Sequence, residues 1–326
     1  MTLRDLIQIA PAAAHAPEAS MTWAEKLTHL RERVAALGSV VVAYSGGVDS
    51  SVVLRVAHEM LGEHALGVIG RSDSYAEREL TLALEQAARF GARVEVVTTG
   101  ELADPNFRSN PANRCYHCKS ELYRKLGSVA ERVGARAVLD GTIRDDLGDW
   151  RPGRQAAAEG NVESPLAELG FTKADVRAVA THYGLPSQDK PASPCLASRI
   201  PYGSEITREK LQAVERGEEA LRGLGFRELR LRHLGDTARI EVPASDIAKF
   251  VDPAARMAVV RAMKSLGFLY VALDLEGFRS GSLNASLSAE DRAGVTPARP
   301  SSAAGGAEGH ARPVEQVRPG APGNPE

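Results

Sequence analysis

A glycine-rich string holds the side chains of this sequence that are best placed for chemistry: Ser45-Gly46-Gly47-Val48-Asp49-Ser50-Ser51. It follows an apolar run, Val40–Tyr44, that predicts a buried strand, and it leads into a predicted helix over Ser50–Met60. Backbone amides and the helix dipole attract an anion at such a junction, and two glycines let phosphate oxygens approach the backbone closely. The string therefore predicts a phosphate site, with hydroxyl donors at Ser45, Ser50 and Ser51 and a magnesium ligand at Asp49.

Two better-known phosphate motifs do not fit this string. It lacks the Gly-Lys-Ser/Thr ending of a Walker A loop, and its glycines do not have the spacing of the dinucleotide fingerprint. The alternative without a ligand is a tight strand-to-helix turn in which Asp49 or Ser50 only caps the helix. The string resembles the loop of the PP-loop ATP pyrophosphatases, which implies that ATP is cleaved between its α and β phosphates.

Three cysteines form a second candidate site. Cys115 and Cys118 lie one helical turn apart in Cys-Tyr-His-Cys, and Cys195 follows much later in Pro-Cys-Leu-Ala-Ser-Arg. Three thiolates can hold three irons of a [4Fe–4S] cluster and leave the fourth iron open. The alternatives are zinc with His117 as a further ligand, a redox pair, a reactive thiol without a cluster, and a pair of small buried side chains unrelated to Cys195.

The elements that must position these residues alternate between strand and helix. Apolar runs predict strands at Val40–Tyr44, Ala65–Ile69, Val94–Thr98 and Ala137–Asp140. Helical patterns between them predict helices at Ser50–Met60, Ala76–Phe90 and Ser120–Val133. The alternation predicts a doubly wound, mostly parallel α/β sheet. The segment 145–204, which includes a helix at Thr172–Tyr183 with Thr172 and Asp175 as a capping pair, is expected to cross the carboxyl ends of the strands.

Four segments are predicted along the chain. Residues 1–21 read as a loose extension, and residues 22–203 form the α/β domain. A small α+β domain is predicted for 204–276, with helices at Thr207–Leu224 and Pro253–Leu266 and strands at 228–232, 238–242 and 269–273. Glycine, proline, alanine and serine dominate 277–326, which predicts a disordered tail.

Composition argues against several classes of partner. The net charge of −2 and the 5% of aromatic residues predict no nucleic-acid partner. No apolar run is long enough to predict a membrane span, and the N-terminus lacks the features of a secretory signal. An odd count of three cysteines argues against a disulfide framework, so the reducing cytoplasm is the predicted compartment.

Five strings in one order resemble the LarE family of ATP-dependent sulfur transferases, which serve nickel-pincer nucleotide synthesis. They are SGGVDSS, RCYHCKSELY (114–123), DGTIRDDLGDWRPGRQA (140–156), PCLASRIPYG (194–203) and RLRHLGDTARIEV (230–242), and the likeness covers about residues 22–275. The resemblance implies ATP, Mg²⁺ and, as substrate, a nicotinate-derived mononucleotide with two carboxylates. It further implies that one carboxylate is adenylated and that sulfur then displaces AMP to leave a thiocarboxylate.

The resemblance also implies roles for the cysteines. Cys195 matches the cysteine that, in the single-cysteine form of the family, gives up its own sulfur. Cys115 and Cys118 resemble the extra pair of the three-cysteine variant, which binds a [4Fe–4S] cluster. Family members often self-associate, which implies a homo-oligomer. Other PP-loop chemistries, namely tRNA thiolation or an ammonia-using synthetase, and a nucleotide-binding regulatory module remain the alternatives.

Charged residues elsewhere are weighed from their positions. Arg230 and Arg232 alternate on a predicted strand and share one face, which suits a substrate phosphate or an exposed strand face. Lys119 is expected to neutralise phosphates, and Arg199 to bind the acyl phosphate or a thiolate. The remaining candidates are metal or substrate ligands at Asp145, Asp146, Glu218 and Glu241, with loop capping as the alternative for the first two, and a structural histidine at His233.

Overall fold

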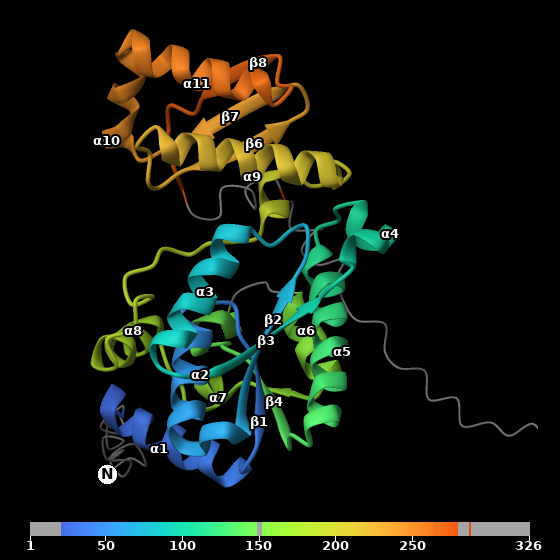
Figure 1. Cartoon of the computed structure of the whole chain (residues 1–326), viewed down its shortest axis with the longest axis vertical. Helices are drawn as coiled ribbons and strands as arrows, with labels where there is room; N and C mark the ends of the chain where they lie inside the picture. Colours follow the sequence, from blue (N-terminus) through green and yellow to red (C-terminus); the bar gives the residue numbers. More distant parts are fainter. Residues whose placement is uncertain (1–20, 149–151, 280–286, 288–326) are drawn as a thin grey trace, which may run out of the picture. The chain divides into compact units, whose positions relative to one another are not determined.

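The computed structural model describes residues 21–148, 152–279 and 287. Among these residues the larger sheet has five parallel strands in the order β3-β2-β1-β4-β5, which confirms the predicted doubly wound α/β architecture (Figure 1). They are β1 (Val40–Ala43), β2 (Ala65–Arg71), β3 (Arg93–Thr98), β4 (Ala137–Leu139) and β5 (Val162–Glu163). The two-residue β5 was not predicted, because no apolar run marks it in the sequence.

The central strand β1 explains where the glycine-rich string lies. Its residue Val41 is paired with Leu66 of β2 on one side and with Val138 of β4 on the other. A central parallel strand is covered on both faces, which is why its sequence is an unbroken apolar run. The strand order reverses between β1 and β4, so their carboxyl ends border the crevice where open α/β sheets bind ligands.

Helices cover both faces of the sheet (Figure 1). The apolar core on one face joins β1 to α1 (Trp23–Leu37), α2 (Val48–Leu61), α3 (Glu77–Arg89) and α8 (Lys173–His182). The core on the other face joins it to α5 (Arg114–Val133) and α6 (Gly153–Glu159). Successive valines of β1 serve the two cores in turn: Val40 and Val42 pack in the first and Val41 in the second.

Two helix starts bear on the site. The start of α8 has the predicted capping box, since the Asp175 amide donates to the Thr172 hydroxyl at 3.2 Å and the Thr172 amide donates back to the Asp175 carboxylate at 2.9 Å. The start of α5 lies at Arg114, six residues before the predicted one. The cysteine pair 115 and 118 therefore lies on the first turns of a helix.

The smaller sheet consists, in the described part of the chain, of β6 (Arg230–Leu234), β7 (Thr237–Glu241) and β8 (Tyr270–Leu273). β6 and β7 are antiparallel, and β8 runs parallel to β7. A separate apolar core joins this sheet to α9 (Arg208–Gly223) and α11 (Pro253–Ser265). The content of strands and helices agrees with the small α+β domain predicted for 204–276, although its boundaries stay a prediction.

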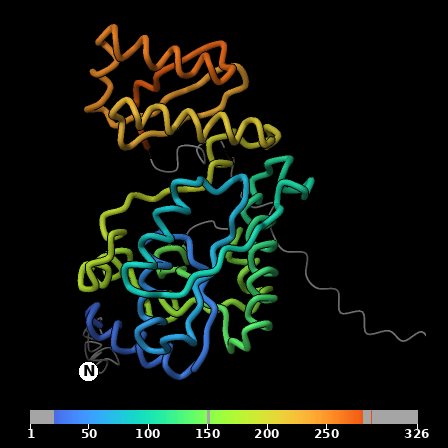
Figure 2. The backbone as a smooth tube through the Cα atoms, in the orientation of Figure 1, coloured from blue at the N-terminus to red at the C-terminus, as the bar shows by residue number. Residues whose placement is uncertain are grey.

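The remaining elements are short. They are the 3₁₀ turns η1 (Gly62–His64), η2 (Glu101–Ala103), η3 (Arg144–Gly148), η4 (Leu196–Arg199) and η5 (Ala248–Val251), and the helices α4 (Pro105–Arg108), α7 (Pro165–Glu168) and α10 (Ala244–Ile247). Figure 2 shows the trace after α8 continuing towards η4, and residues 190–195 of it are in neither helix nor strand.

Two predictions concern the ends of the chain and the membrane. The predicted extension 1–21 and tail 277–326 lie almost wholly outside the described residues. Within the described residues, the structure contains no helix with the length and apolar character that a membrane crossing requires.

Candidate functional site

The glycine loop, residues 45–51, joins the end of β1 to the start of α2. Gly46 has a φ of 66°, in the left-handed region that favours glycine, and a Cβ here would come within 2.6 Å of the Ala83 Cβ on α3. Gly47 caps the amino end of α2 with its backbone extended. Backbone conformation and close packing against α3 therefore both require glycine at position 46.

The three serines of this loop differ in what their hydroxyls contact. Ser45 is exposed, and its hydroxyl lies 3.1 Å from that of Ser50. Ser51 is fully buried, and its hydroxyl donates to the Gly47 carbonyl at 2.7 Å and accepts from Gln86 at 2.5 Å. In this structure the buried Ser51 hydroxyl therefore stabilises the loop conformation through hydrogen bonds to protein groups, whereas Ser45 is accessible to a ligand.

Asp49 forms an ion pair that no sequence pattern predicts. The Lys173 ammonium lies 2.8 and 2.7 Å from the two carboxylate oxygens of Asp49, and the two side chains are 43% and 27% exposed. Lys173 is the first residue of α8, so the only sequence signal for it was a lysine at the start of a predicted helix. A cation beside the first turn of α2 adds a second group that can bind a phosphate.

The two aspartates of η3 have capping contacts. Asp145 accepts a hydrogen bond from the backbone amide of Lys173 at 2.8 Å, and Asp146 accepts one from the amide of Ile143 at 3.1 Å. These contacts agree with loop capping, which is the alternative to the predicted role of the two aspartates as metal ligands.

A buried polar network lies at the end of β4, on the other side of the crevice. Lys119 donates to the Tyr123 hydroxyl at 3.3 Å, and Tyr123 donates to Asp140 at 3.2 Å. The Tyr123 oxygen raises the pKa of Lys119, burial opposes the rise, and Asp140 adds to it. Lys119 therefore stays charged, and its contact with a phosphate stays a prediction.

The end of β4 packs directly against the glycine loop. A Cβ at Gly141 would lie 2.6 Å from the Ser50 amide nitrogen.

The three cysteines approach one another. Cys118 and Cys195 pack against the same apolar cluster, which contains Phe107. Burial raises the pKa of the Cys118 thiol, and the charges of Glu101, Cys195 and Cys115 raise it further. These effects on Cys118 require the other two thiols to lie within electrostatic reach of it.

The described residues contain no group of three His, Cys, Asp or Glu side chains arranged to hold a single metal ion. His117, the suggested fourth zinc ligand, has its Nδ1 atom 3.6 Å from the Asp104 carboxylate. The zinc alternative therefore lacks a ligand set in the part of the chain that the structure describes.

Arg199 holds the turn that carries Cys195. Its side chain is only 2% exposed and donates to Glu218 at 2.8 and 3.2 Å. It also donates to the backbone carbonyls of Pro194 at 2.5 Å and Cys195 at 3.1 Å. Burial raises the pKa of Glu218, but the Arg199 guanidinium outweighs this effect and the pKa lies below its ordinary value. In this structure the predicted acyl-phosphate ligand Arg199 thus binds protein groups.

Arg232 has a similar arrangement. It is buried and donates to both carboxylate oxygens of Glu241 at 2.9 Å, and to the Ser198 carbonyl at 2.7 Å. Glu218 and Glu241 are thus partners of buried arginines, and no contact to a metal or a substrate is needed to account for them. His233 packs edge-on against Phe268, as expected of a structural histidine.

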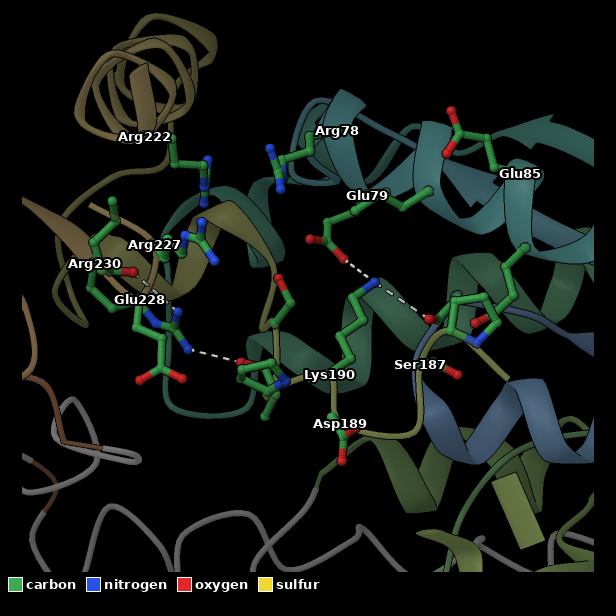
Figure 3. Close-up of a pocket in the computed structure, with 18 of the residues that line it drawn as sticks. Arg78, Glu79, Glu85, Ser187, Asp189, Lys190, Arg222, Arg227, Glu228 and Arg230 are labelled. Carbon is green, nitrogen blue, oxygen red and sulfur yellow. Dashed lines mark hydrogen bonds and ion pairs between the residues drawn. The ribbon is translucent and has the colours of Figure 1, made fainter. Parts of the chain in front are cut away.

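A cavity of about 440 Å³ opens beside Gly46, between α3, the segment 186–193 and the turn 227–230 (Figure 3). Its cationic lining residues are Arg78, Arg89, Lys190, Arg222, Arg227 and Arg230, and its acidic ones are Glu79, Glu85, Asp189 and Glu228. Of the cations, Arg78, Arg89 and Arg227 form no ion pair with another described residue. The cavity therefore favours an anion.

Two features connect this cavity to the predicted site. Arg230 donates to the Ala192 carbonyl at 3.0 Å, and burial, together with the charge of Arg199, lowers its pKa to about 10. A smaller hollow at Cys195 shares Arg78, Glu79, Ser193 and Arg222 with the cavity. The glycine loop and Cys195 therefore border adjoining hollows.

Comparison with known proteins identifies relatives of this chain. A family model described as NAD synthase matches residues 22–110. An uncharacterized protein of Synechocystis is 48% identical over 79% of this chain and 97% of its own length. The pyridinium-3,5-bisthiocarboxylic acid mononucleotide synthase of Lactiplantibacillus plantarum is 40% identical over 82% of this chain and 96% of its own length. A tRNA-specific 2-thiouridylase of Xanthobacter autotrophicus is 31% identical, over 55% of this chain and 56% of its own length.

Proposed function

The chain belongs to the LarE family of PP-loop ATP pyrophosphatases, and we propose that it converts a carboxylate of a pyridinium dicarboxylate mononucleotide into a thiocarboxylate. The observation that carries this proposal is the pair of adjoining hollows, one bordered by the glycine loop and the other by Cys195. An adenylating centre and a sulfur-delivering residue must act on the same carboxyl group, so they need to share one site. A mononucleotide of the kind that names the Lactiplantibacillus synthase, in contrast to a tRNA, also fits a cavity with small volume and an excess of cations.

ATP binding is assigned to the glycine loop. The loop amides and the Ser45 hydroxyl would bind the pyrophosphate part of ATP, and the Asp49 carboxylate would hold Mg²⁺. Lys173 now pairs with Asp49 and would neutralise the phosphates beside it. These groups stabilise the negative charge that builds up on pyrophosphate as it leaves.

Adenylation is the first chemical step. A carboxylate oxygen of the substrate attacks the α-phosphorus of ATP, the bond from that phosphorus to the bridging oxygen breaks, and pyrophosphate leaves. The product is an acyl adenylate, whose AMP group leaves readily. A sulfur nucleophile then attacks the acyl carbon, and AMP departs with the electron pair of the acyl–oxygen bond.

The cavity beside Gly46 is proposed to admit the mononucleotide. Its exposed arginines would attract the phosphate and the carboxylates, and Arg230 is the predicted phosphate ligand that lines it. Arg232 is buried against Glu241, so a role in binding phosphate requires a rearrangement of that pair.

We propose that Cys115, Cys118 and Cys195 hold a [4Fe–4S] cluster. Thiolates on a cubane bind separate irons and need not meet at one point, so mutual approach without a single-ion geometry is compatible with a cluster. When bound by three thiolates, such a cluster offers one open iron that can carry sulfur. The alternative is that Cys195 gives up its own sulfur.

Release of pyrophosphate tests the proposed substrate class. The protein is incubated with ATP, Mg²⁺ and either pyridinium-3,5-dicarboxylic acid mononucleotide or bulk tRNA. We expect pyrophosphate release that depends on the mononucleotide. Release that depends on tRNA instead would favour the thiolation chemistry of the 2-thiouridylase relative.

A further inference from the structure

Lys190 connects three parts of the site. Its ammonium lies 2.6 Å from a carboxylate oxygen of Glu79 on α3 and 3.4 Å from the carbonyl oxygen of Gly46 in the glycine loop (Figure 3). Lys190 itself belongs to the segment that leads into Cys195. The two charged side chains are only 20% and 17% exposed, so water screens their attraction less than it screens a surface pair.

The two residues that the Lys190 ammonium contacts, Gly46 and Glu79, are held by packing within and against α3. Gly46 packs against Ala83 of α3 so closely that a Cβ would overlap it, and Glu79 lies one helical turn before Ala83 on the same helix. The ammonium therefore joins a unit made of α3 and the glycine loop. A change in this loop on nucleotide binding would act directly on Lys190.

The chain between Lys190 and Cys195 is restrained at several points. Pro191 and Pro194 restrict its backbone dihedrals, and the residues between carry hydrogen bonds: Arg230 to the Ala192 carbonyl at 3.0 Å and Arg199 to the Pro194 carbonyl at 2.5 Å. These restraints connect the position of Lys190 to that of Cys195 along a short stretch of chain.

We propose that Lys190 is a positioning residue that couples the glycine loop to the placement of Cys195. This inference rests on the proposed function, in which the two must act in sequence on one acyl group. Adenylation depends on the loop, whose shape is also held by Ser51, Gln86 and Ala83 and so does not rest on Lys190 alone. Sulfur delivery depends on where Cys195 lies. Loss of the Lys190 contact would therefore impair the second step and spare the first.

The measurement is the partition of the acyl adenylate: the ratio of thiocarboxylate formed to pyrophosphate released, with pyridinium-3,5-dicarboxylic acid mononucleotide and sulfide. For Lys190→Met we expect this ratio to fall about 10-fold, because a misplaced nucleophile lets water take the acyl group, while pyrophosphate release changes by less than about 3-fold. The ratio is independent of the fraction of folded enzyme, so a loss of folded protein alone would not change it. Glu79→Gln, which keeps the side-chain shape, should lower the ratio in the same direction, and Lys190→Arg should restore most of it.

Lys26 offers a matched control. Its ammonium lies 2.7 Å from Asp175 and 2.8 Å from the Gly170 carbonyl, with side chains 9% and 18% exposed, so its contacts are of the same kinds. It belongs to α1 and has no contact with the glycine loop or the Cys195 segment. Lys26→Met should leave the ratio unchanged.

Three outcomes would overturn the inference: an unchanged ratio in Lys190→Met and Glu79→Gln, an equal fall in Lys26→Met, or no recovery in Lys190→Arg. If Lys190→Met does not fold, the inference is tested by Glu79→Gln alone, through its ratio of thiocarboxylate formed to pyrophosphate released. Failure of the proposed function is recognised separately, because the parent protein would then form no thiocarboxylate.

Discussion

At the scale of single residues, the pair Asp49–Lys173 is the centre of the proposed ATP site. Asp49→Ala removes the proposed magnesium ligand and Lys173→Met removes a phosphate-neutralising charge, so each should lower mononucleotide-dependent pyrophosphate release at least about 100-fold. The pair is partly exposed, so its loss should cost no more than about 1 kcal/mol of stability. Both effects are measured by a pyrophosphate assay and by thermal melting.

Lys249→Met is the control for that experiment. Lys249 also pairs with an aspartate, Asp246 at 2.8 Å, but on the smaller α+β region and without contact to the loop. Its activity should equal that of the parent. An Asp49→Ala protein with parental pyrophosphate release would remove the glycine loop from the reaction.

The cysteines give a second prediction at this scale. With a cluster and supplied sulfide, each enzyme should make many thiocarboxylates, and Cys115→Ala, Cys118→Ala and Cys195→Ala should each stop turnover and remove the visible absorption and iron of anaerobically purified protein. With a self-sacrificing Cys195, product would halt at about one sulfur per chain.

Mass spectrometry of the protein after turnover separates these two accounts. An intact Cys195 agrees with the cluster. Dehydroalanine at position 195, together with normal activity of Cys115→Ala, would contradict it.

At the scale of elements, the junction of β1, α2 and α3 requires glycine at position 46. Gly46→Ala places a Cβ against Ala83 in a left-handed conformation, so we expect loss of ATP binding and a destabilisation of about 2–4 kcal/mol from strain and overpacking. Gly134 is the control, because it too has a positive φ, of 68°, but open space where the Cβ would lie. Gly134→Ala should cost only about 1 kcal/mol and leave ATP binding intact.

Calorimetric titration with ATP and denaturant unfolding measure these two effects. Equal behaviour of the two alanine variants would show that close packing against α3 is unimportant for the loop.

The buried pair Arg199–Glu218 joins η4 to α9, and it gives the second prediction at this scale. Arg199→Met leaves the Glu218 carboxylate buried with less compensation, so unfolding free energy should fall by about 3–5 kcal/mol. The double variant Arg199→Met, Glu218→Leu should recover part of this loss, since no uncompensated charge remains. Denaturant unfolding of both proteins checks the expectation, and a double variant less stable than the single one would contradict it.

Sequence patterns predicted the helices and strands well, but they did not predict the side-chain contacts between those elements. The unbroken run of valines marked β1, and Thr172 with Asp175 marked the start of α8, because both signals are local. The contact of Lys173 with Asp49 joins residues far apart in the chain, and no local pattern predicts it. Arg230 and Arg232 illustrate the same point: alternation correctly put both on one strand, but only tertiary packing gives Arg232 its buried partner Glu241.

At the scale of the whole molecule, the relatives show how much of the chain is similar to them. The synthase of Lactiplantibacillus is matched over 96% of its length by 82% of this chain. The predicted loose extension and disordered tail stay predictions, as does self-association. Sedimentation of the purified protein would report its oligomeric state directly.

The most direct test of the account is the identity of the product. The parent protein is incubated anaerobically with ATP, Mg²⁺, sulfide and pyridinium-3,5-dicarboxylic acid mononucleotide, and the small molecules are identified by mass spectrometry. The account predicts a mononucleotide in which sulfur replaces one carboxylate oxygen, formed together with AMP and pyrophosphate. Formation of AMP and pyrophosphate with an amide, or with no sulfur in the product, would contradict it.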